Sequence, residues 1–271
     1  MKENFLSIYI DKIQSLILKK YKNKVVSLIL FGSLASPKSE KSFSTDVDLI
    51  IVVKDTCSQK VKKEILEEIQ AVEKQLLISY TSNGFIFGIQ QVTGMFINQF
   101  VCFYSDFIYR RFHKVFHVNR FISSILAPQE SIWISIKNNY QIILGEDTVK
   151  QWISLPNLTR LENTRSFFMN LLLSIGTIFL CIFNTKALKF SMEAIKWSLF
   201  TWRNFLNLES ISIEETGKIY LAKYPISSIE LNGIKEFLLY RSKKRGRRSL
   251  AIYGLLLVTI IHFRVLQFTF H

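Results

Sequence analysis

Two short apolar runs, residues 25–31 (VVSLILF) and 47–53 (VDLIIVV), constrain the fold of this chain more than any other feature. Both are rich in β-branched residues, and a polar stretch that contains Pro37 and several serines separates them. A short, nearly continuous apolar run bounded by glycine or polar residues is typical of a buried strand. The pattern therefore predicts two strands of one sheet, joined by a loop.

The remainder of the first half alternates helical and extended patterns. Residues 4–21 and 60–77 carry apolar side chains at helical spacing. Residues 84–88 and 95–103 read as two further strands separated by a polar turn. Residues 125–149 resist assignment, with Pro128 as a break and a turn at residues 145–147. The first half is predicted to be α/β.

From about residue 157 onward the pattern is helical almost throughout. Pro156 and Asn157 interrupt the apolar pattern, so we place a domain boundary there. The predicted domains are residues 1–155, which contain the sheet, and residues 156–271, an all-α helical bundle.

One segment of the second half, residues 166–185, is uncharged and long enough to span a membrane. Its polar residues recur at helical intervals and collect on one stripe, as in a bundle helix with a polar seam. They are Ser166, Asn170, Ser174, Thr177 and Asn184. A second uncharged segment, residues 249–263, is short for a span. We expect a soluble bundle and regard membrane insertion as the less favoured alternative.

The next helical segment is amphipathic, which supports packing in water. One predicted face is polar and the other apolar. The polar face holds Lys186, Lys189, Glu193, Lys196 and Arg203, and the apolar face holds Leu188, Ile195, Leu199, Trp202 and Leu206.

Composition narrows the class of protein. Hydrophobic residues make up 49% of the 271, which excludes a disordered chain. Cys57, Cys102 and Cys181 stand far apart, so neither a disulfide framework nor a zinc site is expected. We expect a reducing, cytoplasmic location instead. The N-terminus does not resemble a signal peptide. The net charge of +14 is compatible with an anionic partner, although the densest basic run, residues 241–248, reads as a solvated helix end or loop.

The residues that carry chemistry lie around the two apolar runs. Gly32 and Ser33 follow the first run, and after twelve intervening residues Asp46 and Asp48 flank Val47 at the start of the second. Side chains alternate along a strand, so both carboxylates project to one face while Val47 points into the core. Two adjacent carboxylates repel each other unless a cation lies between them. Mg²⁺ suits such a pair, because it takes one or two carboxylates and completes its shell with water and phosphate oxygens.

The glycine and serine are suited to holding phosphates. Gly32 lacks a Cβ, so backbone N–H groups can approach a phosphate closely, and Ser33 offers a hydroxyl donor. Either half of this pattern alone is weak evidence.

In this order and spacing, between two apolar strands, the residues resemble the signature of the DNA polymerase beta type nucleotidyltransferase superfamily. The resemblance covers roughly the first 110 residues. It implies an α/β (α+β) catalytic domain with a small mixed sheet, in which Asp46 and Asp48 are catalytic and would hold two Mg²⁺ ions. Gly32 and Ser33 would hold the nucleotide. The implied reaction moves a nucleoside monophosphate from an NTP, ATP before others, to a hydroxyl of an unidentified acceptor.

A softer resemblance concerns residues 190–199 (FSMEAIKWSL), which look like the helical bundle of kanamycin nucleotidyltransferase-like enzymes. It implies that Glu193 and Lys196 are candidates to face the active site, with Lys196 on a phosphate. We favour the alternative that both lie on the solvated face of their helix.

The chain departs from the superfamily in one respect. Active members usually carry a third carboxylate on a later strand, but residues 95–103 contain no acid. Asn98 and Gln99 occupy about the right place, and neither amide can take a proton. Asp106 lies just beyond and reads as a helix N-cap. The base is therefore absent, supplied by the helical half or replaced by the substrate's surroundings; otherwise the protein is a binding module that does not turn nucleotide over.

Two histidines, His113 and His117, could share a helix face near Arg110 and Arg111. With no third ligand in the sequence nearby, we read them as surface or core histidines.

Overall fold

The computed structural model describes residues 3–35, 47–76, 98–152, 158–208, 212–243 and 246–268. These residues divide into two compact units. The first comprises residues 3–35, 47–76, 98–123 and 136–152, and the second comprises residues 124–135 and the described residues from 158 onward. The division into domains 1–155 and 156–271 stays a prediction, and residues 124–135 group with the helical unit.

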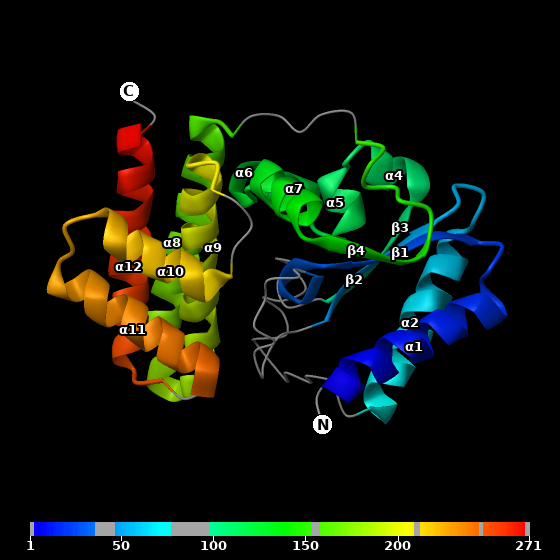
Figure 1. The fold of residues 1–271 in the computed structure, drawn as a ribbon, viewed down its shortest axis with the longest axis horizontal. Coiled ribbons are helices and arrows are strands. Elements are labelled where there is room, and N and C mark those ends of the chain that lie inside the picture. The colour runs from blue at the N-terminus through cyan, green and yellow to red at the C-terminus, as the bar shows by residue number, and fades with distance from the viewer. Residues whose placement is uncertain are drawn as a thin grey trace. The chain divides into compact units, whose positions relative to one another are not determined.

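The described part of the first unit contains a mixed sheet in the order β3-β2-β1-β4 (Figure 1). The strands are β1 (Val25–Phe31), β2 (Asp48–Val53), β3 (Gln99–Phe103) and β4 (Tyr140–Gly145). β1 is antiparallel to both β2 and β4, whereas β2 and β3 are parallel. The two apolar runs are therefore neighbouring strands, as predicted, and the small mixed sheet confirms the predicted fold class.

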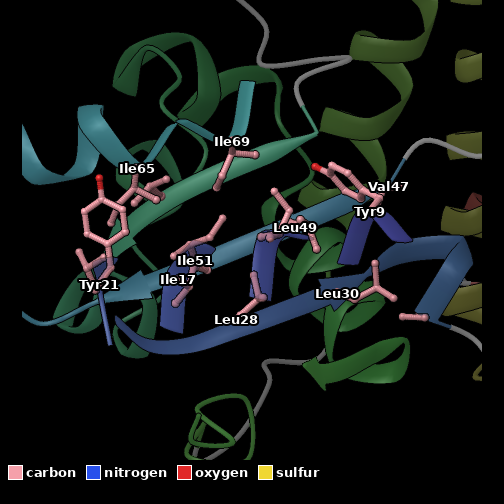
Figure 2. Packing of buried hydrophobic residues seen from close by; sticks show 14 residues of the cluster. Tyr9, Ile17, Tyr21, Leu28, Leu30, Val47, Leu49, Ile51, Ile65 and Ile69 are labelled. Carbon is pink, nitrogen blue, oxygen red and sulfur yellow. The ribbon is translucent and has the colours of Figure 1, made fainter. Parts of the chain in front are cut away.

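Two helices, α1 (Glu3–Lys20) and α2 (Gln59–Gln75), cover one face of this sheet. Figure 2 shows side chains from both helices packed against β1 and β2. The cluster includes Tyr9, Ile17, Leu28, Leu30, Val47, Leu49, Ile51, Ile65 and Ile69. Burial of each large apolar side chain stabilises the fold by about 1.5–3 kcal/mol. This core holds the start of β2, and with it Asp48, in a defined position.

Aromatic side chains lie on the other face of the sheet. The ring centroids of Phe31 and Phe100 are 6.3 Å apart, and Phe100 meets Phe116 edge-on at 5.0 Å. Phe116 follows the short helix α5 (Phe112–Val115), which is preceded by α4 (Tyr104–Ile108). These rings form an apolar layer on the face opposite α1 and α2.

Residues 125–149, left unassigned by sequence, contain regular structure. They include the end of α6 (Arg120–Leu126), then α7 (Gln129–Asn138) and the edge strand β4. Gly145 ends β4 at a φ of +84°, and a Cβ there would lie 2.0 Å from the carbonyl oxygen of Val26. The predicted turn at Gly145 is thus the point where β4 leaves the sheet.

The described part of the second unit is helical, as predicted. Its helices are α8 (Arg160–Phe183), the 3-10 helix η2 (Thr185–Ala187), α9 (Leu188–Phe205), α10 (Ile213–Lys223), α11 (Ser228–Lys243) and α12 (Ser249–Phe268). Trp202 of α9, Tyr220 of α10 and Phe237 of α11 are fully buried in one apolar cluster. Trp202 and Tyr220 pack edge to face, with centroids 5.2 Å apart.

The polar stripe of α8 faces the interior of its unit. Ser166, Asn170, Ser174 and Thr177 are fully buried. The Ser166 hydroxyl lies 2.7 Å from that of Thr201, and the Asn170 amide donates to Ser198 at 3.2 Å. The predicted polar seam is confirmed for these residues, whereas Asn184 is exposed and caps the helix end.

The predicted polar face of α9 is wrong at Arg203. Its side chain is 2% exposed, and burial lowers the pKa of the guanidinium to about 10. The charge lies 4.6 Å from the ring centroid of Phe200. A cation over an aromatic face explains how Arg203 is accommodated among apolar residues, which helical periodicity alone does not reveal.

His262 of α12 completes the polar seam. Its Nδ1 lies 2.7 Å from Asn163 Oδ1, and its Nε2 lies 3.1 Å from Ser198 Oγ. The side chain is 2% exposed, and burial lowers the pKa of the imidazole to about 3. Between about pH 3 and pH 6.5, His262 is therefore neutral in the folded state and protonated in the unfolded chain.

This difference predicts acid-sensitive stability. Between the unfolded pKa near 6.5 and the folded value, only the unfolded state binds the proton, so stability is complete above pH ~6.5 and falls as the pH falls. We expect the free energy of unfolding to fall by about 2 kcal/mol between pH 7 and pH 5 because of His262. Urea unfolding of wild type and His262→Gln at both pH values measures this. An equal loss of stability in the two proteins would contradict it.

Among the described residues, two helices are long and apolar enough to cross a membrane by length and composition. They are Arg160–Phe183 and Ser249–Gln267, whose most apolar windows are 28% and 44% buried. The expectation that both pack in water stays a prediction. Less than half of each window is covered, so much of the apolar surface of α8 faces outward.

Candidate active site

The predicted site lies at the end of the sheet where β1 ends and β2 and β3 begin. Asp48 opens β2 and pairs with Phe31 of β1, which pairs in turn with Tyr140 of β4. Leu49 pairs with Gln99, and the Leu49 N–H donates to the Asn98 carbonyl at 2.7 Å. Asn98 is thus across from Asp48. Paired residues point to the same face, so Asn98, Asp48, Phe31 and Tyr140 form one row across the sheet.

Gly32 lies directly against the Asp48 carboxylate. A Cβ at this position would be 2.7 Å from Asp48 Oδ2, closer than carbon and oxygen can approach. The backbone φ of Gly32 is +79°, in the left-handed region that favours glycine, and its N–H donates to the Asn139 carbonyl at 3.1 Å. Glycine is required here for two independent reasons, and its missing side chain lets the half-buried Asp48 carboxylate lie directly against the turn.

The other two predicted site residues lie wholly or partly outside the described part of the structure. Ser33 lies in the 3-10 helix η1 (Gly32–Ala35), but its side chain is outside the described part of the structure, as is all of Asp46. Val47 is 8% exposed and belongs to the core under α1 and α2, as predicted. That Asp46 projects to the same face as Asp48 stays a prediction based on alternation.

The register decides between the two amides of β3. Gln99 is buried on the α1 and α2 face, where its amide donates to Glu73 Oε1. The Tyr9 hydroxyl donates to the same oxygen at 3.0 Å, and burial, followed by the charge of Glu73, raises the pKa of Tyr9. Asn98, one residue earlier, is therefore the one of the two predicted candidates that lies on the Asp48 face.

This assignment predicts opposite effects for two neighbouring substitutions. Asn98→Asp should place a carboxylate beside Asp48 and tighten Mg²⁺ binding about tenfold, because the cation would keep it ionised as a ligand. Gln99→Asp should instead destabilise the protein by roughly 1–3 kcal/mol, because it replaces a donor to Glu73 with a second buried acceptor. Calorimetric Mg²⁺ titration and urea unfolding measure the two effects. The register would be wrong if Gln99→Asp tightened Mg²⁺ binding and Asn98→Asp did not.

Asp106 cannot supply the missing carboxylate, because it lies beyond the opposite end of β3. The strand alone separates Asn98 from Phe103 by about 17 Å. The prediction that Asp106 is an N-cap is wrong: Phe103 caps α4, and Asp106 is a buried residue within it. Its carboxylate accepts from Arg111 at 3.1 Å and lies 3.4 Å from the Lys114 ammonium. Asp106 therefore anchors the basic residues around α5.

His113 and His117 do not share a helix face. α5 ends at Val115, and His117 follows it at a φ of +54°. Its Nε2 lies 2.9 Å from the Val101 carbonyl oxygen. Among the described residues there is no cluster of three or more histidine, cysteine or acidic side chains that could hold a metal.

Glu193 and Lys196 form an ion pair with each other on α9. Their side chains are 15% and 22% exposed, so the favoured expectation of a solvated face is wrong for both. In the basic run at residues 241–248, Lys243 at the end of α11 and Arg247 and Arg248 before α12 are exposed, as expected, whereas the Arg241 side chain is only 13% exposed. Within it, the Arg241 guanidinium pairs with Glu214 at 2.8 Å.

Comparison with known proteins supports the fold. No family model matches the chain, and no curated protein matches its sequence. Among solved structures, it is similar to spectinomycin adenyltransferase AAD(9) from Enterococcus faecialis, solved with ATP and spectinomycin. The TM-score is 0.55 at 13% identity, and the match covers 96% of this chain and 98% of that one. The chain therefore has a nucleotidyltransferase fold.

The predicted site residues Gly32 and Asp48 meet where β1 ends and β2 and β3 begin. This end of the sheet combines a carboxylate, a glycine with no room for a side chain and an apolar aromatic layer. Sequence reasoning found Gly32 and Asp48 but did not place Tyr140 in the same row of the sheet, where it pairs with Phe31. Its hydroxyl donates to Asp147 at 3.1 Å, and its burial and this contact raise the pKa of Tyr140. The signal that could have found it is the short apolar run that follows, residues 142–144.

Proposed function

We propose that this protein is a Mg²⁺-dependent nucleotidyltransferase that moves the nucleoside monophosphate of ATP to a hydroxyl of an acceptor. The observation that carries the proposal is the Asp48 carboxylate beside Gly32, at the start of a strand and in a nucleotidyltransferase fold. A carboxylate held rigidly at the start of a strand, directly against a backbone turn that carries no side chain, fits a hard cation and its phosphate ligands.

Asp46 and Asp48 are the residues that would hold Mg²⁺. Bound there, the ion would neutralise charge on the triphosphate and on the departing pyrophosphate. The chain's own contribution is to fix Asp48 through the buried remainder of β2 and to present the backbone after Gly32 to the β- and γ-phosphates. Ser33 would add a hydroxyl donor to the same phosphates.

The acceptor is proposed to be a small molecule that carries hydroxyl groups. The solved neighbour holds ATP and spectinomycin, which supports this class without identifying the compound. Asn98 cannot take up the hydroxyl proton, because an amide is not basic. Three free cysteines support a cytoplasmic location.

A second candidate function is nucleotide binding without turnover. It is favoured by Asn98, which stands where active members of the superfamily usually carry a carboxylate. In that case Asp48 and Gly32 would still hold ATP and Mg²⁺, but no group in the row Asn98, Asp48, Phe31 and Tyr140 would activate an acceptor.

Two measurements on the full chain separate these functions. Calorimetric titration with ATP and Mg²⁺ reports binding, and a pyrophosphate-release assay with a panel of hydroxylated small molecules, spectinomycin included, reports transfer. Binding together with acceptor-dependent pyrophosphate release supports the transferase. Binding without release with any acceptor supports the binding module, and no binding of ATP contradicts both.

A further inference from the structure

The outward face of α8 carries a continuous apolar stripe, which we call the α8 stripe. It consists of Leu161, Phe168, Leu172, Ile175, Phe179 and Ile182. Their side chains are between 38% and 64% exposed. Large apolar side chains exposed singly are ordinary, but a contiguous row along one helix marks an interaction surface.

The orientation of α8 makes this surface unusual. The opposite side of the helix, with Ser166, Asn170 and Ser174, is buried against α9 and α12. In a helix that packs only within its own unit, the apolar side would be expected to face the core. Here the unit buries small polar residues and leaves the larger apolar ones outside, so the contacts within this unit do not account for the stripe.

The spacing of the stripe suits another helix. From Phe168 to Ile182 the residues recur at intervals of four and three, and Leu161 precedes Phe168 by seven. This is the repeat of a coiled-coil seam, in which each side chain enters a hole between residues of a facing helix. The one charged residue in line with the stripe, Arg165, is paired with Glu162 at 2.9 Å.

Gly176 provides a second, independent observation. It lies beside the stripe in the interior of α8, where glycine costs about 1 kcal/mol relative to alanine. A Cβ there would meet no neighbouring element within 4 Å, so packing within the chain does not require glycine. Glycine on an exposed helix face allows the backbone of a second helix to approach closely.

The area of the stripe is appropriate for a dimer. The exposed fractions correspond to roughly 600 Å² of apolar surface, given side-chain areas on the order of 200 Å². A standard protein interface takes about 800 Å² from each partner, so the six side chains of the stripe alone supply roughly three quarters of that area.

We infer that the α8 stripe is a self-association surface, on which two copies of this chain pair through antiparallel α8 helices. A two-fold axis at Leu172 brings Phe168 of each copy to Gly176 of the other, so a large ring meets the position without a side chain. Such a pairing is self-complementary, as a two-fold interface requires.

Sedimentation velocity of the full chain over about 1–100 μM tests this inference. Wild type should shift from monomer to dimer, whereas Leu172→Arg and Gly176→Phe should each weaken dimerisation at least a hundredfold. Leu18→Arg is the matched control, because it makes the same change at an exposed leucine of α1 and should dimerise as wild type does. Circular dichroism checks that each variant is folded.

Three outcomes would overturn the inference. The first is a wild-type chain that remains monomeric throughout the range. The second is dimerisation of folded Leu172→Arg or Gly176→Phe with the wild-type constant. The third is a monomer that floats with phosphatidylglycerol vesicles in a manner lost in Leu172→Arg, which would assign the stripe to an anionic membrane surface instead. None of these outcomes depends on nucleotidyl transfer.

Discussion

Asp48→Asn should reduce Mg²⁺-dependent nucleotidyl transfer by about two orders of magnitude or more, at least the cost of removing one group that stabilises transition-state charge. The substitution keeps the shape of the side chain and removes its charge, and a neutral amide is a poor ligand for Mg²⁺. The fold should survive, because Asp48 is the first residue of β2 and the buried remainder of that strand is unchanged. In metal-free buffer the melting temperature should be unchanged or higher, since one of two neighbouring negative charges is lost.

The measurement is pyrophosphate release at saturating ATP and Mg²⁺, with thermal unfolding in the presence of a chelator. Asp11→Asn is the matched control, because Asp11 is an exposed acid on α1 that accepts a hydrogen bond from Ser7. It should transfer nucleotide at the wild-type rate. Asp48→Asn with the wild-type rate would remove Asp48 from the proposed site. If the wild type itself releases no pyrophosphate, ATP and Mg²⁺ titration of the same two variants provides the comparison.

The strands that position Asp48 could be predicted because they are buried on both faces. β1 and β2 lie between the α1 and α2 core and the aromatic layer, so nearly every residue is apolar and the run is visible in the sequence. β4 lies at the edge of the sheet and its side chains are half-buried or exposed. Its only continuous apolar run is the three residues 142–144, a weaker signal than the seven-residue runs of β1 and β2, so the sequence does not predict it.

The second unit shows the limit of periodicity more clearly. The polar stripe of α8 was predicted, but a helical period gives two opposite faces and does not say which is buried. An inward face of Ser166 and Asn170 is stable only because Thr201, Ser198 and His262 supply hydrogen-bonding atoms from other helices. Arg203 was misassigned for the same reason, since its burial depends on Phe200 and the packing around it.

The candidate site could be predicted as a pair of motifs but not as an arrangement. Gly32 is recognisable because it directly follows the apolar run of β1, and Asp48 because it opens the apolar run of β2. Their direct contact depends on the antiparallel pairing of Phe31 with Asp48. The choice of Asn98 over Gln99 depends on a register between β2 and β3, which are far apart in the sequence.

Gly32→Val should reduce nucleotide affinity more than a hundredfold, a larger effect than the roughly tenfold loss expected for Ser33→Ala, which removes one donor to a charged phosphate. Valine adds a Cβ where the Asp48 carboxylate already lies 2.7 Å away, and a β-branched residue is strongly disfavoured at a φ of +79°. Gly32→Asn separates these causes, because asparagine tolerates left-handed backbone but still carries a Cβ. If contact with Asp48 is decisive, Gly32→Asn should bind ATP as poorly as Gly32→Val while keeping more of the wild-type melting temperature. Calorimetric ATP titration and thermal unfolding of the three variants measure both quantities, and wild-type affinity in Gly32→Val would show that the phosphates do not approach this turn.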